Sequence, residues 1–201
     1  MSSLRNTSSS ATPSNRAAGD DALLDAARAG IVALGWRRST LTDVARRAGV
    51  SRMTIYRRWQ DMQSLVADLM TREWSGLAAE PPTAGSARER LAVGVAATVA
   101  ALRGNELFRT IVEVDPELLL PYLLERRGRT QDALLARLEA GIAEGRADGS
   151  VRAGDPVLLA RSVLLAAYGF GLSTSTMTGG PLDAAAFDGE LRALVDGYLR
   201  P

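Results

Sequence analysis

The sequence of 201 residues contains no cysteine, no histidine and no lysine. Without cysteine the chain has no disulfide bond and no thiol nucleophile. Without histidine it lacks the commonest metal ligand and the commonest general base. We therefore expect no metal and no cofactor, and an enzyme built on this chain would depend on carboxylates such as Glu113 and Asp115.

Arginine supplies all of the positive charge, and it is unevenly distributed along the chain. The net charge at pH 7 is +1, but the segment from Trp36 to Trp59 holds seven arginines and one acidic residue, Asp43, so it carries +6 and the remainder −5. A basic patch on a mildly acidic body is typical of a nucleic-acid-binding segment. The alternative is a cationic surface that contacts only solvent.

The sequence lacks the features of an exported or membrane protein. The N-terminus has no apolar core of the kind that signal peptides carry. The most apolar stretch, PVLLARSVLLAAYGFGL (156–172), is interrupted by Arg161 and runs into serines and threonines. We expect it to be too short and too polar to cross a bilayer, and we expect a cytoplasmic protein that does not bind membranes.

Apolar residues recur at helical spacing along most of the chain. Residues 1–19 are rich in Ser, Thr, Asn and Pro, which predicts a disordered arm. The helical pattern begins at Asp20, and one long helix is predicted across residues 116–149. No segment alternates as a β-strand does, so we predict an all-α fold of about nine helices. The apolar stripe of the first helix comprises Leu23, Leu24, Ala27, Ile31 and Leu34.

The segment TLTDVARRAGVSRMTIYRRW (40–59) has the pattern of two short helices joined by a tight turn. Thr40 and Asp43 have capping-box spacing at the start of the first helix. Gly49 stands where the chain leaves that helix, at a position that favours a positive φ. Ser51 is placed to cap the second helix. The segment is therefore predicted to be a helix-turn-helix.

Burial of Ile55 and Trp59, four residues apart, turns the other side chains of the second helix outward. Such a helix can enter the major groove, where Arg52 can bind guanine through two hydrogen bonds and Met53 can contact a thymine methyl group. Met53 is equally suited to be a partly exposed packing residue. Hydroxyl and guanidinium groups suit phosphate oxygens. The predicted DNA-contacting residues are Thr40, Thr42, Ser51, Arg52, Met53, Thr54, Tyr56, Arg57 and Arg58.

This segment resembles the helix-turn-helix of the tetracycline-repressor-like (TetR) family, whose pattern is T-x-x-x-I/V-A-x-x-A-G-V-S-x-x-T-I/L-Y-x-x-F/W. The likeness covers roughly residues 20–75, about a quarter of the chain. Arg58 stands where the family usually has histidine, and it retains a phosphate donor. Met62 stands where the family usually has a phosphate-contacting lysine, so that contact is lost. The matching residues are Thr40, Val44, Ala45, Ala48, Gly49, Val50, Ser51, Thr54, Ile55, Tyr56 and Trp59.

The resemblance implies a homodimeric transcriptional regulator, most often a repressor, that binds a palindromic operator in double-stranded DNA. It implies a DNA-binding domain over residues 20–66 and a C-terminal domain over residues 67–201, which pairs the chains and houses a pocket for an apolar or amphipathic effector. The predicted pocket residues, each of which could instead belong to the core, are Phe108, Ile111, Val112, Tyr122, Tyr168 and Met177.

The last two predicted helices are those that pair the chains in this family. The first of them is apolar on nearly all sides, and such a helix must be covered all round, which favours a partner subunit. The predicted dimer-interface residues are Leu158, Leu159, Val163, Leu164, Ala167, Leu191, Leu194 and Val195.

Three alternatives to an effector-controlled repressor remain at this point. The first is a regulator of the same fold that answers to a protein partner, or to no signal, and has a filled core. The second is a helical enzyme that uses carboxylates, although the chain has no phosphate-cradling glycine loop to support it. The third is a structural helical adaptor, which would leave the clustered arginines unexplained.

Overall fold

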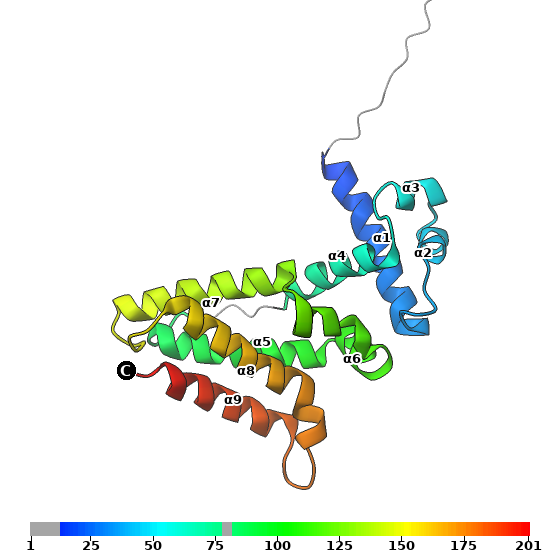
Figure 1. The fold of residues 1–201 in the computed structure, drawn as a ribbon. Coiled ribbons are helices and arrows are strands. Elements are labelled where there is room, and N and C mark those ends of the chain that lie inside the picture. Colours follow the sequence, from blue (N-terminus) through cyan, green and yellow to red (C-terminus); the bar gives the residue numbers. More distant parts are fainter. Residues whose placement is uncertain (1–12, 78–81) are drawn as a thin grey trace, which may run out of the picture. The chain divides into compact units, whose positions relative to one another are not determined.

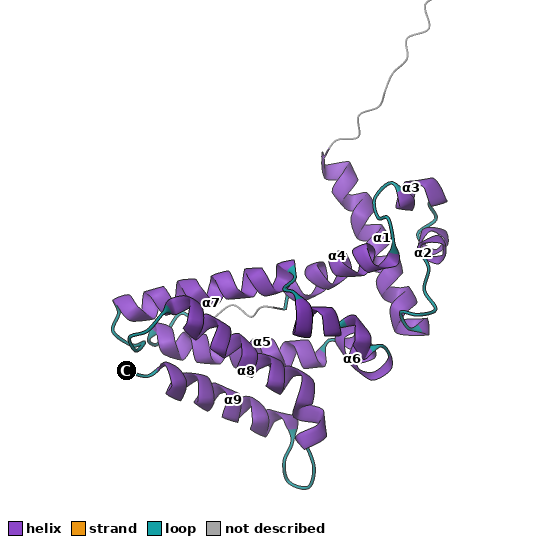
Figure 2. Cartoon of the chain, in the orientation of Figure 1, coloured by secondary structure: helices purple, strands orange, loops and turns teal. Residues whose placement is uncertain are grey.

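A computed structural model describes residues 13–77 and 82–201 of the chain. The described residues are helical, and their sheet-like pairing is limited to one isolated bridge, Gly179 with Leu182 (Figure 2). The prediction of an all-α fold of about nine helices is confirmed. The helices are α1 Pro13–Leu34, α2 Leu41–Arg47, α3 Arg52–Tyr56, α4 Met62–Ser75, α5 Ala87–Gly104, α6 Glu106–Val114, α7 Arg129–Ala147, α8 Pro156–Met177 and α9 Ala184–Leu199.

The chain divides into two compact units, Met1–Val66 and Ala67–Pro201. In the N-terminal unit α1 and α3 each contact α2, and their apolar side chains form the core. The predicted stripe of α1 is buried except for Leu34, which is exposed in the last turn of the helix. The core of this unit comprises Leu23, Leu24, Ala27, Ile31, Leu41, Val44, Ala45, Ile55, Trp59, Leu65 and Val66.

Helix α1 begins at Pro13 and not at Asp20, so the predicted disordered arm is too long at its C-terminal end. Proline is favoured at the first helical position because its missing N–H has no partner there in any case. The remainder of the predicted arm, residues 1–12, lies outside the described residues.

In the C-terminal unit α5 contacts α7, α8 and α9, as Figure 1 shows. α8 also contacts α7 and α9. Small side chains of α5, such as Ala92 and Ala96, are buried where these helices come together. The larger apolar side chains of the shared core are Val99, Leu135, Leu138, Ile142, Val151, Leu159, Val163, Leu164, Leu191, Val195 and Leu199.

The predicted long helix over residues 116–149 is wrong in its first third. A 3-10 turn at Pro116–Leu118 and a π-type turn at Pro121–Glu125 precede α7, which begins only at Arg129. Proline has no N–H to donate to a helix, so Pro121 breaks the hydrogen-bond ladder. Gly128 then lies so close to the Tyr122 ring that an added Cβ would stand 3.0 Å from it. This contact between the turn and Gly128 fixes the position at which α7 starts.

Helix α8 is long and apolar enough to cross a bilayer by length and composition, so the prediction that this stretch is too short and too polar is wrong. The helix continues to Met177, and hydroxyl groups near its end bond back to its own carbonyls, as Thr174 Oγ1 does to the Phe170 carbonyl at 2.5 Å. Core helices of soluble proteins meet the same criterion, and α8 packs against α5, α7 and α9.

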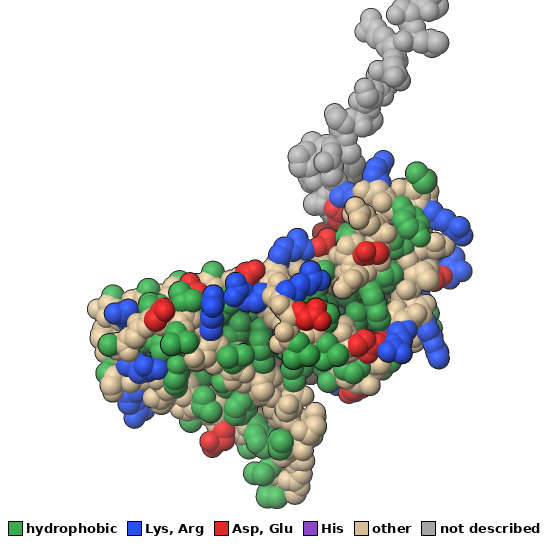
Figure 3. Space-filling model, in the orientation of Figure 1, with side chains coloured by type: hydrophobic (Ala, Val, Ile, Leu, Met, Phe, Trp, Pro, Cys, Tyr) green, Lys and Arg blue, Asp and Glu red, His purple; other side chains and the backbone are tan. Residues whose placement is uncertain are grey.

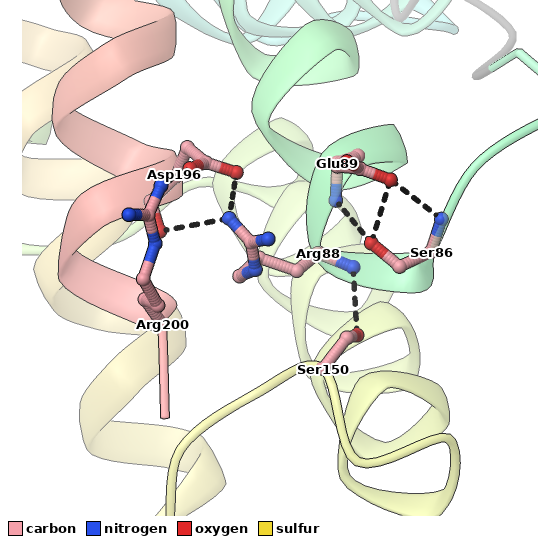
Figure 4. Close-up of polar contacts among 6 residues, drawn as sticks. All are labelled: Ser86, Arg88, Glu89, Ser150, Asp196 and Arg200. Atoms are coloured by element: carbon pink, nitrogen blue, oxygen red, sulfur yellow. Dashed lines mark hydrogen bonds and ion pairs between the residues drawn. The ribbon is translucent and has the colours of Figure 1, made fainter.

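Ion pairs and hydrogen bonds join the first turn of α5 to α9 and to the loop after α7 (Figure 4). Arg88 pairs with Asp196, and Asp196 also accepts a hydrogen bond from Arg200 at 2.7 Å. The hydrogen bonds from Arg88 and then from Arg200 hold the pKa of Asp196 below its ordinary value. Both members of the Arg88–Asp196 pair are largely buried, so this pair stabilises the packing of α5 on α9.

Replacing Asp196 with asparagine is expected to lower the free energy of unfolding at pH 7 by about 1–3 kcal/mol, since charge-assisted hydrogen bonds are lost. A carboxylate whose pKa is lowered by folding stabilises the fold above its unfolded pKa, and that stabilisation disappears as the pH falls through the folded pKa. The difference between wild type and Asp196→Asn should therefore shrink below about pH 4. Urea denaturation at pH 7 and pH 3 measures it.

Asp132→Asn is the matched control for this experiment, because Asp132 pairs with Arg127 on the exposed surface. Exposed pairs contribute about 0–1 kcal/mol, so this variant should unfold nearly as the wild type does. An equal loss of stability in both variants would contradict the role given to the Arg88–Asp196 pair.

Candidate functional site

The helix-turn-helix segment begins with a capped helix, as its spacing predicts. Thr40 has extended backbone angles, and its Oγ1 accepts a hydrogen bond from the Asp43 amide at 3.2 Å. The Thr40 hydroxyl donates to Asp43 Oδ2 at 2.6 Å, and Arg46 pairs with the other carboxylate oxygen at 2.8 Å. The hydrogen bond from Thr40 is the main cause that holds the pKa of Asp43 below its ordinary value.

The turn between α2 and α3 depends on Gly49, whose φ of +67° lies in the left-handed region. The Val50 amide returns to the Ala45 carbonyl at 3.0 Å and closes the turn. Ser51 then caps α3, because its Oγ accepts a hydrogen bond from the Thr54 amide at 3.2 Å. The predicted turn and the predicted cap are both confirmed.

Burial of one side of α3 leaves the other side facing solvent. Ile55 is fully buried and Trp59 nearly so, whereas Met53 is 78% exposed. Among the other predicted DNA-contacting residues, Thr40, Ser51, Arg52, Tyr56 and Arg57 are exposed, and Thr42 and Thr54 are half-buried. The structure thus brings these residues together on and beside α3, around a short helix whose inner side is fixed by the core.

Arg58 differs from the other predicted phosphate-binding residues. Its Nη1 pairs with Asp20 Oδ2 of α1 at 2.5 Å, and the two side chains are only 27% and 30% exposed. This ion pair joins the end of the helix-turn-helix to α1, so Arg58 supports the structure of the unit, and its phosphate contact stays a prediction. The partner precedes Arg58 by 38 positions in the sequence, and the local spacing within the motif could not indicate it.

Four further arginines extend the cationic surface beyond the predicted residues. Arg37 and Arg38 follow α1, Arg46 and Arg47 end α2, and all four are exposed. Figure 3 shows arginine side chains along the outer edge of this unit. These residues contribute to the positive charge of the segment, but the motif pattern does not point to them.

A cavity of about 390 Å³ lies between α5, α7 and α8 in the C-terminal unit. Most of its lining is apolar, with Thr98, Arg90, Arg137, Glu144 and Tyr168 as its polar side chains. Burial raises the pKa of Tyr168, so the phenol stays neutral and keeps its hydrogen-bonding proton.

Only Tyr168 among the six predicted pocket residues lines this cavity. Phe108 and Ile111 are buried in the core, and the Phe108 ring meets the edge of Trp74 with ring centroids 5.8 Å apart. Val112 and Tyr122 are half-buried elsewhere, and Met177 is exposed. This cavity lies between the long helices α5, α7 and α8, and a ligand contact by the other five predicted residues stays a prediction.

The predicted dimer-interface residues differ in their exposure to solvent. Ala167 lines the cavity, and Leu158 and Leu194 are exposed. Leu165, which was not predicted, is 68% exposed and lies two turns after Leu158 on the same side of α8. Hydrophobic side chains over α8 and α9 are visible in Figure 3. The predicted residues that are buried in the chain's own core are Leu159, Val163, Leu164, Leu191 and Val195.

Comparison with known proteins agrees with this architecture. The family described as "Bacterial regulatory proteins, tetR family" matches residues 23–69, which include the whole helix-turn-helix. An uncharacterized HTH-type (helix-turn-helix) transcriptional regulator of Mycobacterium tuberculosis is 38% identical over 177 residues, which cover 88% of this chain and 92% of the relative. A regulator of the same description from Mycobacterium bovis has the same identity and coverage.

Solved structures resemble the fold at lower sequence identity. The transcriptional regulator FadR of Bacillus subtilis, in complex with stearoyl-CoA, is 18% identical with a TM-score of 0.66, covering 90% of this chain and 99% of that one. The SmeT–triclosan complex is 20% identical with a TM-score of 0.60 and covers 92% of each chain. From its relatives, the chain belongs to the TetR family of helix-turn-helix transcriptional regulators, which are not enzymes.

Proposed function

We propose that this protein is a cytoplasmic repressor that binds a palindromic operator as a homodimer and leaves it when a small molecule occupies the cavity. Residues 20–66 bind DNA in this scheme, and residues 67–201 pair the chains and hold the effector. The observation that carries the proposal is the exposed surface of residues 37–57, where six arginines are exposed and the one acidic residue, Asp43, is engaged by Thr40 and Arg46.

Exposed residues of α3 have different roles in this proposal. Arg52 opens the helix and is long enough to form two hydrogen bonds with guanine in the major groove. Met53, which extends into solvent, offers an apolar contact to a neighbouring thymine methyl group. Arg57 follows the helix and binds phosphate, which adds affinity without sequence information.

Arg52→Ala and Arg57→Ala separate base reading from phosphate binding. The operator is first identified by selection of bound fragments from a random DNA pool, and a two-fold-symmetric consensus is expected. Arg52→Ala should then cost about 1–3 kcal/mol and relax the choice of base at one position in each half-site. Arg57→Ala should weaken binding to all sequences alike and reduce the slope of log K against log salt by about 1 for each arginine lost. Fluorescence anisotropy at several salt concentrations measures both.

Arg109→Ala is the control, because Arg109 is exposed on α6 in the C-terminal unit. It should leave operator binding unchanged. Normal operator binding by both Arg52→Ala and Arg57→Ala would show that α3 is not the recognition helix.

Control by an effector follows from the geometry of a dimer on DNA. Two recognition helices must lie about one helical turn of DNA apart, roughly 34–36 Å, to reach both half-sites. A ligand acts only through its different affinities for the two arrangements of the dimer. The cavity provides a place for such a ligand, and the related folds of FadR and SmeT have been solved with stearoyl-CoA and triclosan bound.

Control by a protein partner is the second candidate within the same fold. A bound ligand must raise the melting temperature by mass action, so screening small molecules for thermal stabilisation separates the two candidates. Release of operator DNA by the same stabilising compound would support the effector-controlled repressor.

A further inference from the structure

The cavity has a charged end and an apolar end. Arg90, in the first turn of α5, pairs with Glu144, in the last turns of α7. Leu102 and Leu134 line the cavity toward the other ends of these two helices. The fifteen positions that separate Ala87 from Leu102 correspond to about 22 Å along α5, so the cavity is elongated.

Positive charge exceeds negative charge around this cavity. Its charged lining residues are two arginines, Arg90 and Arg137, and one carboxylate, Glu144. Arg137 lies seven positions before Glu144, two turns away on the same side of α7. A ligand with a negative head can form a charge-assisted pair with Arg90, which a positive or a neutral head cannot do.

The two members of the Arg90–Glu144 pair are held to very different degrees. The Arg90 side chain is only 19% exposed, and its Nη1 also donates to the Gly85 carbonyl at 2.5 Å, which fixes the guanidinium at the cavity. The Glu144 side chain is 61% exposed, so it can turn into solvent without losing its hydration. A carboxylate that enters the cavity can replace Glu144 as the partner of Arg90.

We propose that the cavity binds an amphipathic carboxylate, whose head pairs with Arg90 in place of Glu144 and whose linear apolar chain lies along α5 and α7 toward Tyr168. The inference rests on the proposed effector role of the cavity. Leu91, Val95 and Leu138 supply the apolar walls along this path. Glu144 acts as a built-in competitor that occupies Arg90 until the ligand arrives.

Three probes with the same alkyl chain test the head group on the full-length protein: dodecanoate, dodecanol and dodecyltrimethylammonium, each kept below the concentration at which it forms micelles. Calorimetric titration gives the affinities, and melting curves give the stabilisation. Dodecanoate is expected to bind at least about tenfold more tightly than the alcohol, because the charge-assisted pair with Arg90 is added. The ammonium compound should bind most weakly.

Substitutions at the two ends of the ion pair should act in opposite directions. Arg90→Gln should weaken dodecanoate binding about tenfold or more and leave dodecanol binding unchanged. Glu144→Gln should strengthen dodecanoate binding several-fold, because it removes the competing carboxylate. Arg146→Gln, at an exposed arginine of α7 that does not line the cavity, is the matched control and should bind as wild type.

The outcomes separate this inference from the proposed function. If dodecanol or the ammonium compound binds as tightly as dodecanoate, the cavity is a ligand site but the choice of a carboxylate is wrong. Weaker dodecanoate binding by Glu144→Gln would overturn the exchange of partners, even if Arg90→Gln did not fold. Failure of all three probes to bind or to stabilise the wild type would count against the effector role of the cavity itself.

Discussion

Replacing Leu165 with arginine is expected to separate the proposed dimer into monomers and to reduce operator affinity by about 100-fold or more. Leu165 is 68% exposed on α8, beyond the reach of the chain's own core, so the monomer should fold normally. In the dimer the new guanidinium would be buried without a partner, which is costly. Loss of the second DNA-binding unit removes an avidity of about 10²–10⁴.

Sedimentation analysis and operator titration measure the two effects on the same sample. Leu124→Arg is the matched control, because Leu124 is equally exposed in the same unit but belongs to the turn at Pro121–Glu125 and not to α8 or α9. This control should remain dimeric and bind DNA. A Leu165→Arg protein that sediments as a dimer would place the interface on another surface.

Replacing Ile55 with alanine is expected to destabilise the N-terminal unit by about 2–5 kcal/mol, the usual cost of removing a large aliphatic side chain from a core. Ile55 is fully buried and is the one buried residue of α3, so its removal frees the proposed recognition helix from its support. Operator binding should therefore be lost at temperatures where the C-terminal unit stays folded.

Tryptophan fluorescence during urea denaturation follows this change in a Trp74→Phe background, where the remaining tryptophans, Trp36 and Trp59, belong to the N-terminal unit. Circular dichroism reports the helices of the larger unit at the same time. Met53→Ala alters the opposite, exposed side of α3 and should leave stability within about 0.5 kcal/mol of wild type. If Ile55→Ala unfolds at the wild-type urea concentration, α3 does not depend on this core.

The helix-turn-helix could be predicted from the sequence because its structure is determined locally. The cap at Thr40, the left-handed Gly49 and the cap at Ser51 each involve neighbours within a few residues, and all three appear in the structure. The burial of Ile55 and Trp59 follows from their spacing on one helix. The side chains of α3 that do not lie on this buried side are then predicted to be exposed.

Features that depend on packing between distant segments could not be predicted in this way. The partner of Arg58 lies on α1, and the cavity is lined by residues of α5, α7 and α8. On α8 nearly every side is apolar, so periodicity cannot tell the side that faces the core, with Leu159 and Val163, from the side that faces outward, with Leu165.

The hydrogen bond from Thr40 to Asp43 has a consequence for the environment in which this surface works. The hydrogen bond holds the pKa of Asp43 below its ordinary value, and arginine is a residue type that proteins do not deprotonate. With no histidine, cysteine or lysine in the chain, the electrical character of the surface is constant across mild acidity and mild alkalinity. Changes in cellular pH therefore leave the charge of this surface unchanged. Salt concentration and the conformation of the protein then control its binding to DNA.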